Sequence, residues 1–247
     1  MPTLHLLGTG SAVCDAHRTA TMLALEWDEK CLLIDCGGDL YQRAMMAGLD
    51  ESGIEGLILT HEHPDHISGF PLFMERLWLG GRTRPIRVYG IAPALEQARR
   101  LLAAFDTSGW ALPEVIWTEF PPTQGAEVIS DETWSVTAAP GVHGVPVSGF
   151  RFRHLPTDTI LVYSCDTEPC ASIAALAADC HVLVHEATGA VSGHTSLAQA
   201  VSVAEDAGAA HLILVHLPRG IVPEDLKPWQ DSTFEIVLGE ELDCFEF

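Results

Sequence analysis

Short apolar runs separated by turn residues recur along the chain and predict many strands. The run Leu57-Ile58-Leu59 is typical of a buried strand, and Asp28-Glu29 predicts the turn of a hairpin. Gly48 marks the end of a predicted helix. The predicted strands are Thr3–Leu7, Met22–Trp27, Lys30–Asp35, Gly56–Thr60, Ile86–Tyr89, Glu127–Ile129, Trp134–Ala138, Gly149–Phe152, Thr159–Tyr163, His181–His185 and His211–His216. The predicted helices are Asp39–Ala47, one from near Asp65 past Phe73, Ala94–Phe105, Pro169–Ala178, Ser196–Ala207 and a short one near Glu224–Trp229, which one or two strands follow.

The order of these elements predicts the fold class. Strands dominate the first part, and strands alternate with helices from Thr159 onward, so we expect an α/β protein with mixed sheets and helices packed outside them. The segment Asp106–Gln124 is rich in Pro and Trp, and we expect it to be irregular. Four residues, His61, Asp166, His185 and His216, fall at the carboxyl ends of predicted strands, where layered α/β folds build their sites.

Composition and charge exclude several classes of partner. The chain has 247 residues, of which 47% are hydrophobic and 19% charged, so it can bury a sizeable core. Its formal charge of −21 disfavours long nucleic acids and anionic membranes as partners. No apolar run approaches the roughly 18 residues that a membrane span needs. The seven cysteines are scattered and odd in number, so we expect reduced thiols in a cytoplasmic protein.

One segment concentrates metal-binding side chains directly after a predicted buried strand. Three imidazoles and a carboxylate, from His61, His63, Asp65 and His66, lie within six residues. His61 and His63 point the same way on extended backbone, and the other two follow at a predicted helix start. Imidazole and carboxylate together suit divalent transition metals, so the segment offers a ligand pair to each of two adjacent ions. A surface histidine cluster or a capping segment is the alternative interpretation.

This segment resembles the His-x-His-x-Asp-His signature of the metallo-β-lactamase-fold hydrolases, and later residues match that family in order. His143 lies in a loop before a strand, and Asp166 lies in Ser-Cys-Asp-Thr, where the family has Ser-Gly-Asp-Thr and this chain has Cys165. His216 ends a late apolar strand. The resemblance implies an αββα four-layer sandwich, formed as a single hydrolase domain by residues 1–247.

The resemblance also implies a dinuclear metal site. The ions are expected to be zinc, with manganese or iron as alternatives. The implied ligands are His61, His63 and His143 for the first ion, Asp65, His66 and His216 for the second, and Asp166 as a bridge between them. A histidine that binds a metal through one ring nitrogen needs a hydrogen-bond acceptor for the other, called here the outer ring nitrogen. Asp35 is the candidate acceptor, and capping of the following Gly-Gly turn is its alternative role.

Two further segments resemble the ribonuclease Z-like branch of this family. One is His185–Thr188, which reads His-Glu-Ala-Thr, and the other contains His194 in Gly-His-Thr-Ser, where the branch has His-Ser-Thr. The resemblance implies catalytic roles for Glu186, His194 and Asp65, with His194 donating a proton or hydrogen bond to a phosphate oxygen or leaving group. For His194 the alternative is a place at a helix terminus that Thr195 or Ser196 caps.

The chain departs from the transfer-RNA-processing members of that branch. His143 and Asp166 are 23 positions apart, which leaves room for one hairpin and none for a long RNA-binding arm. Arg18 and Arg219 stand near the positions of two branch arginines, and either could clamp phosphate or lie on the surface. With the charge of −21, these departures argue against transfer-RNA maturation.

The preferred hypothesis is a metal-dependent phosphodiesterase for a small phosphodiester, such as a cyclic nucleotide, cyclic sugar phosphate or short nucleotide. The nucleophile would be a hydroxide that bridges the two metals. The alternatives are a carboxyl-ester-class hydrolase acting on a lactone, thioester or β-lactam, then a transfer-RNA 3′-processing endonuclease or a non-catalytic metal-bound scaffold. The expected partner is a small anionic substrate, and a homodimer through Phe70–Leu79 is plausible from the branch. Segment Trp78–Arg84, with Trp110 and Trp117, could form a pocket rim or an ordinary packed loop.

Overall fold

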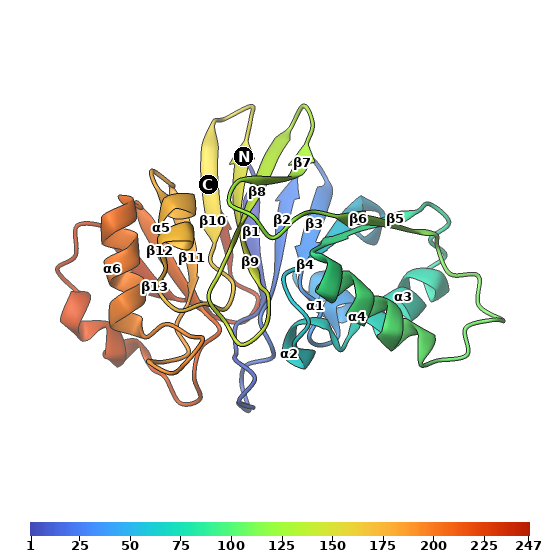
Figure 1. Ribbon diagram of the computed structural model, residues 1–247, viewed down its shortest axis with the longest axis horizontal. Coiled ribbons are helices and arrows are strands. Elements are labelled where there is room, and N and C mark those ends of the chain that lie inside the picture. Colours follow the sequence, from blue (N-terminus) through green and yellow to red (C-terminus); the bar gives the residue numbers. More distant parts are fainter.

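Two seven-stranded sheets face each other in the computed structural model, which describes residues 1–247 (Figure 1). The first sheet contains, in spatial order, β14 (Cys244–Glu246), β1 (Thr3–Gly8), β2 (Met22–Trp27), β3 (Lys30–Ile34), β4 (Ile54–Leu59), β5 (Ile86–Gly90) and β6 (Val115–Glu119). The second contains β13 (Glu235–Leu238), β12 (His211–Val215), β11 (Val182–Glu186), β10 (Thr159–Tyr163), β9 (Ser148–His154), β8 (Trp134–Pro140) and β7 (Ala126–Ser130).

Helices cover the outer faces of both sheets. They are α1 (Leu40–Met46), α2 (Pro64–Ile67), α3 (Phe70–Leu79), α4 (Ala92–Ala103), α5 (Ala171–Ala177) and α6 (Leu197–Ala207), with 3₁₀ turns η1 (Glu51–Gly53) and η2 (Pro223–Trp229). In Figure 1, α1 to α4 lie on one side of the paired sheets, and α5 and α6 on the other. The predicted α/β class and the four-layer helix–sheet–sheet–helix sandwich are therefore confirmed.

Both sheets are mixed, and their pairing follows the same plan. Strands β1, β2 and β3 pair antiparallel, while β3 to β6 pair parallel. Likewise β7 to β10 pair antiparallel, while β10 to β13 pair parallel. The parallel strands of each sheet end at one edge, so the residues that follow them are brought together there.

The inner faces of the two sheets share one hydrophobic core. A cluster of 48 buried residues takes side chains from both sheets and from α1, α3 and α4, and a second cluster of 18 packs α5 and α6 on the other sheet. Strand β4 shows why the run Leu57-Ile58-Leu59 is continuous: it is buried between the opposite sheet and the helices. The single domain over residues 1–247 stays a prediction that this shared core supports.

Two sequence expectations were wrong in detail. Residues within Asp106–Gln124 were expected to be irregular, yet β6 forms there and pairs with β5 over five residues. Strand β6 is a partly exposed strand at the edge of the sheet, so its sequence lacks a strong apolar pattern. Only its pairing with β5 identifies it as a strand. The helix expected to run from Asp65 past Phe73 is instead two helices, because the backbone N–H of Gly69 donates to the carbonyl oxygen of Cys36 and Pro71, at the start of α3, has no N–H to continue the helical pattern.

The face suggested for a homodimer is only partly exposed. Phe70 and Leu77 of α3 are buried in the core, and Leu72 and Leu79 are exposed. The homodimer stays a prediction. No helix of the protein combines the length and the apolar character that crossing a membrane requires.

Leu161 and Leu155 offer a matched test of the core in the β9–β10 hairpin. Leu161 is fully buried, and Leu155 at the turn is 40% exposed. Replacing Leu161 with Ala is expected to lower the free energy of unfolding by about 2–5 kcal/mol, because it removes buried methyl groups and leaves a cavity. Leu155→Ala is expected to change it by less than about 0.5 kcal/mol. Urea unfolding measures both values, and equal losses would contradict the assigned core.

Candidate metal centre

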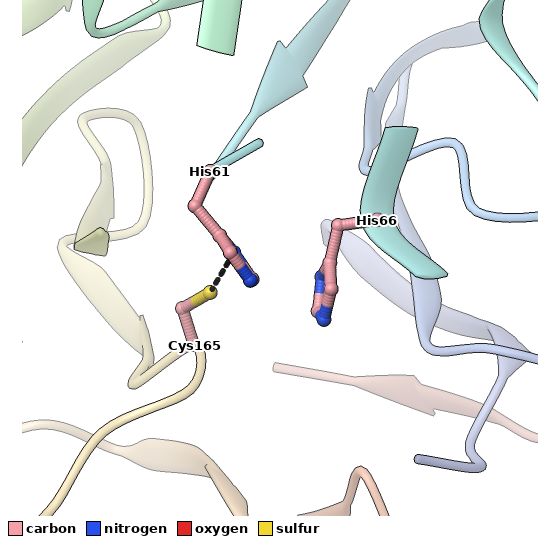
Figure 2. A group of neighbouring side chains, drawn as sticks. All are labelled: His61, His66 and Cys165. Atoms are coloured by element: carbon pink, nitrogen blue, oxygen red, sulfur yellow. Dashed lines mark hydrogen bonds between the residues drawn. The ribbon is translucent and has the colours of Figure 1, made fainter. Parts of the chain in front are cut away.

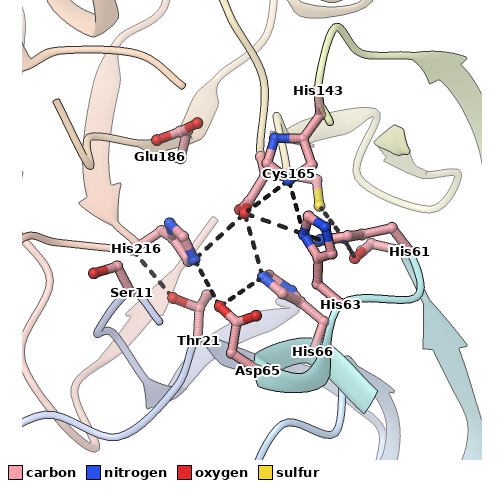
Figure 3. A network of polar contacts seen from close by, with 12 residues as sticks. Ser11, Thr21, His61, His63, Asp65, His66, His143, Cys165, Glu186 and His216 are labelled. Atoms are coloured by element: carbon pink, nitrogen blue, oxygen red, sulfur yellow. Dashed lines mark hydrogen bonds and ion pairs between the residues drawn. The ribbon is translucent and has the colours of Figure 1, made fainter. Parts of the chain in front are cut away.

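The ends of strands from both sheets bring the predicted site residues into one cluster. His61 follows β4, Asp166 follows β10 and His216 follows β12, while His143 lies in the loop after β8. Figure 3 shows the side chains of His61, His143 and His216 pointing toward one another, with Asp65 and His66 approaching from α2. Asp166 lies within 4.0 Å of four of the histidines, so all seven predicted metal ligands meet, although they lie up to 155 positions apart in the chain.

Three histidines form the first group of the cluster. The Nε2 atom of His61 lies 3.2 Å from Nδ1 of His63, and Nε2 of His143 lies 3.0 Å from the same Nδ1. His61 is fully buried, and the other two are partly exposed. The group therefore presents three ring nitrogens to one point at the edge of the solvent.

Two histidines and a carboxylate form the second group. Oδ2 of Asp65 lies 3.3 Å from Nε2 of His216 and 3.5 Å from Nε2 of His66. His66 and His216 are buried. The helix α2 begins with Pro64, and this places Asp65 and His66 on its first turn, beside the His216 ring.

Asp166 lies between the two groups. Its Oδ2 atom is 3.4 Å from the nearest ring nitrogens of His66 and His216, 3.8 Å from that of His143 and 4.0 Å from that of His61. The Asp166 side chain is only 2% exposed. A single carboxylate thus contacts both groups, as a bridging ligand must.

The donor set fits divalent metal ions by two independent observations. Metal–nitrogen bonds of about 2.0–2.1 Å in a tetrahedral site place ligand atoms roughly 3.4 Å apart, which matches the separations of 3.0–3.5 Å within each group. In addition, Nε2 of His66 and Oδ1 of Asp166 are buried with no hydrogen-bond partner. Buried polar atoms of this kind are normally satisfied, so these two point to a missing ligand.

Burial and neighbouring charges shift the pKa values of groups in the cluster. Burial alone would raise the pKa of Asp166, but the nearby His216 and His66 rings lower it well below its usual value. Burial lowers the pKa of His61 well below its usual value, which favours the neutral imidazole that binds a metal. An ionised carboxylate and a neutral imidazole are the forms in which these groups coordinate metals.

Hydrogen bonds to the outer ring nitrogens fix the orientation of four histidines. Nδ1 of His66 contacts Oδ2 of Asp35 at 2.8 Å, which confirms the placement expected for Asp35. Asp35 in turn accepts hydrogen bonds from the backbone and side chain of Thr60. The other contacts are His143 Nδ1 to the carbonyl oxygen of Gly193 at 2.7 Å, His216 Nδ1 to Thr188 Oγ1 at 2.6 Å and His61 Nδ1 to Thr60 Oγ1 at 3.0 Å.

Cys165 adds a second contact to the outer nitrogen of His61. Figure 2 shows its thiol directed at the His61 ring, with Sγ 3.6 Å from Nδ1. Its backbone φ is 52°, in the left-handed region where glycine is favoured, so the family's usual Gly has a conformational reason. Burial raises the pKa of the Cys165 thiol well above its usual value, so the thiol stays protonated beside His61.

His194 and Glu186 form a pair beside the second group. Nδ1 of His194 lies 2.9 Å from Oε1 of Glu186, which is fully buried at the end of β11. The His194 ring stacks on that of His216, with centroids 5.6 Å apart. The hydrogen bond to Glu186 raises the pKa of His194 against the opposing effect of burial. The alternative interpretation is confirmed in one respect, because Ser196 is the N-cap of α6 and accepts a hydrogen bond from the backbone nitrogen of Gln199, while His194 lies two residues before it.

Other residues considered for the site have protein partners instead. The guanidinium of Arg18 binds Thr9 Oγ1, the carbonyl oxygen of Gly239 and Glu240. Trp78 stacks on Trp110, and Trp117 packs on Phe70 of α3 and Arg99 of α4, in the outer helical layer. Arg219 is exposed.

The sequence did not predict that Gly193 and Thr188 contact the outer nitrogens of His143 and His216. The carbonyl oxygen of Gly193 accepts a hydrogen bond from Nδ1 of His143, and the backbone nitrogen of Gly193 donates one to Glu168. Gly193 has a φ of 83° and packs against the His143 ring. Thr188 belongs to the His-Glu-Ala-Thr segment, so that motif carried a signal for it, whereas nothing in the sequence marks Glu168.

Comparison with known proteins identifies relatives of this chain. Residues 30–217 match the family model described as the beta-lactamase superfamily domain. A protein named ribonuclease Z from Mycobacterium sp. (strain KMS) is 31% identical over 269 aligned positions, which cover 96% of this chain and 93% of that protein.

Two solved structures share the fold. The short form of human tRNase Z superposes with a TM-score of 0.81 and 21% identity, covering 99% of this chain and 98% of that one. A diphosphatase of the PhnP family superposes with a TM-score of 0.75 and 21% identity, covering 100% and 97%. At these identities the likeness is one of fold.

Asp35 and Asp50 provide a matched pair for testing the metal centre. Asp35→Asn is expected to weaken zinc binding by about 10–100-fold, because it weakens the acceptor that orients the His66 ring. Asp50→Asn is the control, since Asp50 is exposed and accepts a hydrogen bond only from Ser52 at the start of η1. Competition with a chelating dye gives both affinities. Equal affinity of Asp35→Asn and the unmodified protein would remove the proposed role of Asp35.

Proposed function

Because this chain belongs to the β-lactamase superfamily, in its ribonuclease Z-like branch, we propose that it hydrolyses a small phosphodiester with two metal ions held between its sheets. Family membership makes the protein a metal-dependent hydrolase. The number of ions, their identity as zinc and the substrate class are the proposal. Manganese and iron are the alternatives to zinc that the same ligands allow.

The proposal assigns the seven clustered side chains to two ions. His61, His63 and His143 hold the first, Asp65, His66 and His216 hold the second, and Asp166 contacts both. Divalent ions in such a site polarise a phosphoryl oxygen and lower the pKa of a water molecule. The chain's own contribution is to hold the ligands in fixed orientation through Asp35, Gly193 and Thr188, which are themselves hydrogen bonded to the ring nitrogens.

The pairing of His194 with Glu186 is the observation that carries the reaction type. In phosphodiester hydrolysis, a bond from a water oxygen to phosphorus forms and the bond to the leaving oxygen breaks, so the leaving oxygen needs a proton. Glu186 raises the pKa of His194 and holds the ring beside His216, so His194 is placed to donate that proton. Hydrolysis of a carboxyl ester is the competing reaction, and the likeness of the His194 and Glu186 segments to the ribonuclease Z-like branch favours the phosphodiester.

The structure also supports a substrate of small size. The interval between His143 and Asp166 contains only the β9–β10 hairpin, and its turn spans residues 155–158. The alignment to the mycobacterial ribonuclease Z covers 269 positions, more than the 247 residues of this chain, so that relative carries residues with no counterpart here. With a formal charge of −21, the protein surface repels a long polyanion.

A second candidate function rests on the relatives. The mycobacterial relative is named ribonuclease Z, and the short form of tRNase Z shares the fold over nearly its whole length. Processing of precursor transfer RNA is therefore the rival to the small-phosphodiester proposal, and the two make different predictions for substrate size.

Parallel assays on the zinc-loaded protein separate these functions. We expect turnover of bis(p-nitrophenyl) phosphate and of a cyclic nucleotide, and no cleavage of a precursor transfer RNA, because no arm is present to bind it. Asp65→Asn is expected to abolish turnover, and Asp50→Asn to leave it unchanged. Cleavage of the transfer RNA without turnover of small diesters would establish the rival function. Failure on all three substrates by protein shown to hold metal would refute both.

The acid role of His194 predicts a dependence on the leaving group. His194→Gln is expected to lower kcat by about 10²–10⁴-fold for a diester with a methoxide leaving group, because methoxide needs the proton. The loss should be much smaller for a diester with p-nitrophenolate, which leaves as an anion. Steady-state kinetics on the two diesters measures this, with Glu186→Gln expected to follow the same trend. An equal loss on both diesters would show that His194 does not act as the acid.

A further inference from the structure

A cavity lies between the sheets at the end remote from the metal centre. It has a volume of about 440 Å³, within the usual range of small-molecule sites. Lys30 at the start of β3, Arg87 near the start of β5 and Trp134 at the start of β8 line it. The opposite ends of β3 and β8 lead to Asp35 and His143 of the metal centre, so the length of these strands separates the two sites.

The charges around this cavity leave a positive excess. Three of the 13 basic residues line it, namely Lys30, Arg84 and Arg87, against two acidic ones, Glu55 and Asp131. Glu55 is paired with Arg84 at 3.0 Å. Asp131 accepts the backbone N–H groups of Thr133 and Trp134 through Oδ1.

Lys30 and Arg87 therefore remain without an acidic partner. Both are exposed and form no ion pair, in a chain whose formal charge is −21. Two unpaired cations that line one cavity repel each other and attract an anion. Arginine in particular binds planar or tetrahedral oxyanions through paired N–H groups.

Part of the remaining wall is aromatic. Trp27, Tyr89 and Trp134 line the cavity, and the rings of Trp27 and Trp134 meet edge to face, with centroids 5.4 Å apart. Gly56, which has no side chain, leaves room for the Tyr89 ring: a Cβ there would lie 3.1 Å from it. The indole N–H of Trp134 is buried and has no acceptor in the protein. Ile116 also lines the cavity and is 38% exposed, so apolar surface is open there.

We propose that this cavity is a second binding site, which takes a small organic anion with an aromatic ring, of the size of a nucleoside monophosphate. Arg87 and Lys30 bind the anionic group, and the ring packs against the aromatic wall formed by Trp27, Tyr89 and Trp134. The site is independent of the proposed phosphodiesterase reaction, because it shares no residue with the metal centre. A ligand there contacts both sheets and so can stabilise their packing.

Calorimetric titration with adenosine 5′-monophosphate tests the proposal on full-length protein. Asp65→Asn provides the background, because it weakens binding of phosphate at the metal centre without touching the cavity. We expect saturable binding in that background, and at least tenfold weaker binding of adenosine, which lacks the charge, and of ribose 5-phosphate, which lacks the ring. Quenching of tryptophan fluorescence should accompany binding, since two tryptophans line the cavity.

Substitutions assign the binding to the cavity. Arg87→Gln and, separately, Lys30→Gln are each expected to weaken binding about tenfold, as loss of a charge-assisted hydrogen bond would. Arg100→Gln is the matched control, an exposed arginine of α4 outside the cavity, and should change nothing. The proposal is overturned if the monophosphate does not bind saturably, if neither cavity variant weakens it, or if ribose 5-phosphate binds equally well.

Discussion

The buried carboxylate of Asp166 is the group on which the site depends. A charged oxygen with almost no solvent contact is costly unless opposite charge and donors surround it. Here the ring nitrogens of His61, His66, His143 and His216 lie within 4.0 Å of it, contributed by segments that follow strands of both sheets. The interaction that stabilises the carboxylate thus also fixes how the two halves of the sandwich face each other. Divalent ions between these groups would complete the same charge balance.

Backbone strain at three strand ends aims the side chains into this cluster. Asp35 and His216 come directly after β3 and β12, Cys165 comes two residues after the end of β10, and their φ values are 61°, 50° and 52°. A non-glycine residue in that region costs about 1–3 kcal/mol and persists only where its surroundings impose it. At each of these residues the chain turns away from the sheet. The side chain of Asp35 or His216 itself, or that of Asp166 after Cys165, then faces the cluster. The surrounding hydrogen bonds, such as His216 N–H to Thr21 Oγ1, hold these turns.

The two ends of the sandwich present different chemistry in an acidic protein. At one end, carboxylates and imidazoles converge to hold cations, and the short β9–β10 hairpin adds no surface for a long polymer. At the other end, Lys30 and Arg87 stand unpaired around an aromatic cavity. Negative charge over the remaining surface repels extended polyanions, whereas compact anions can reach either end. Under the proposed function, size and charge together would select the molecules that bind.

The sequence by itself determined the fold class, most of the strands and the side chains that meet in the candidate metal centre, because these depend on local periodicity and on motifs with fixed spacing. The run before His61 and the spacing of His61, His63, Asp65 and His66 are examples. Only the tertiary structure decided the edge strand β6, the break at Gly69, the ion pair of Arg18 with Glu240 and the hydrogen bond that the backbone N–H of Gly193 donates to Glu168. Each of these depends on a partner far away in the chain. Close packing and the hydrogen bonds of buried groups are set where distant segments meet, and no local pattern records them.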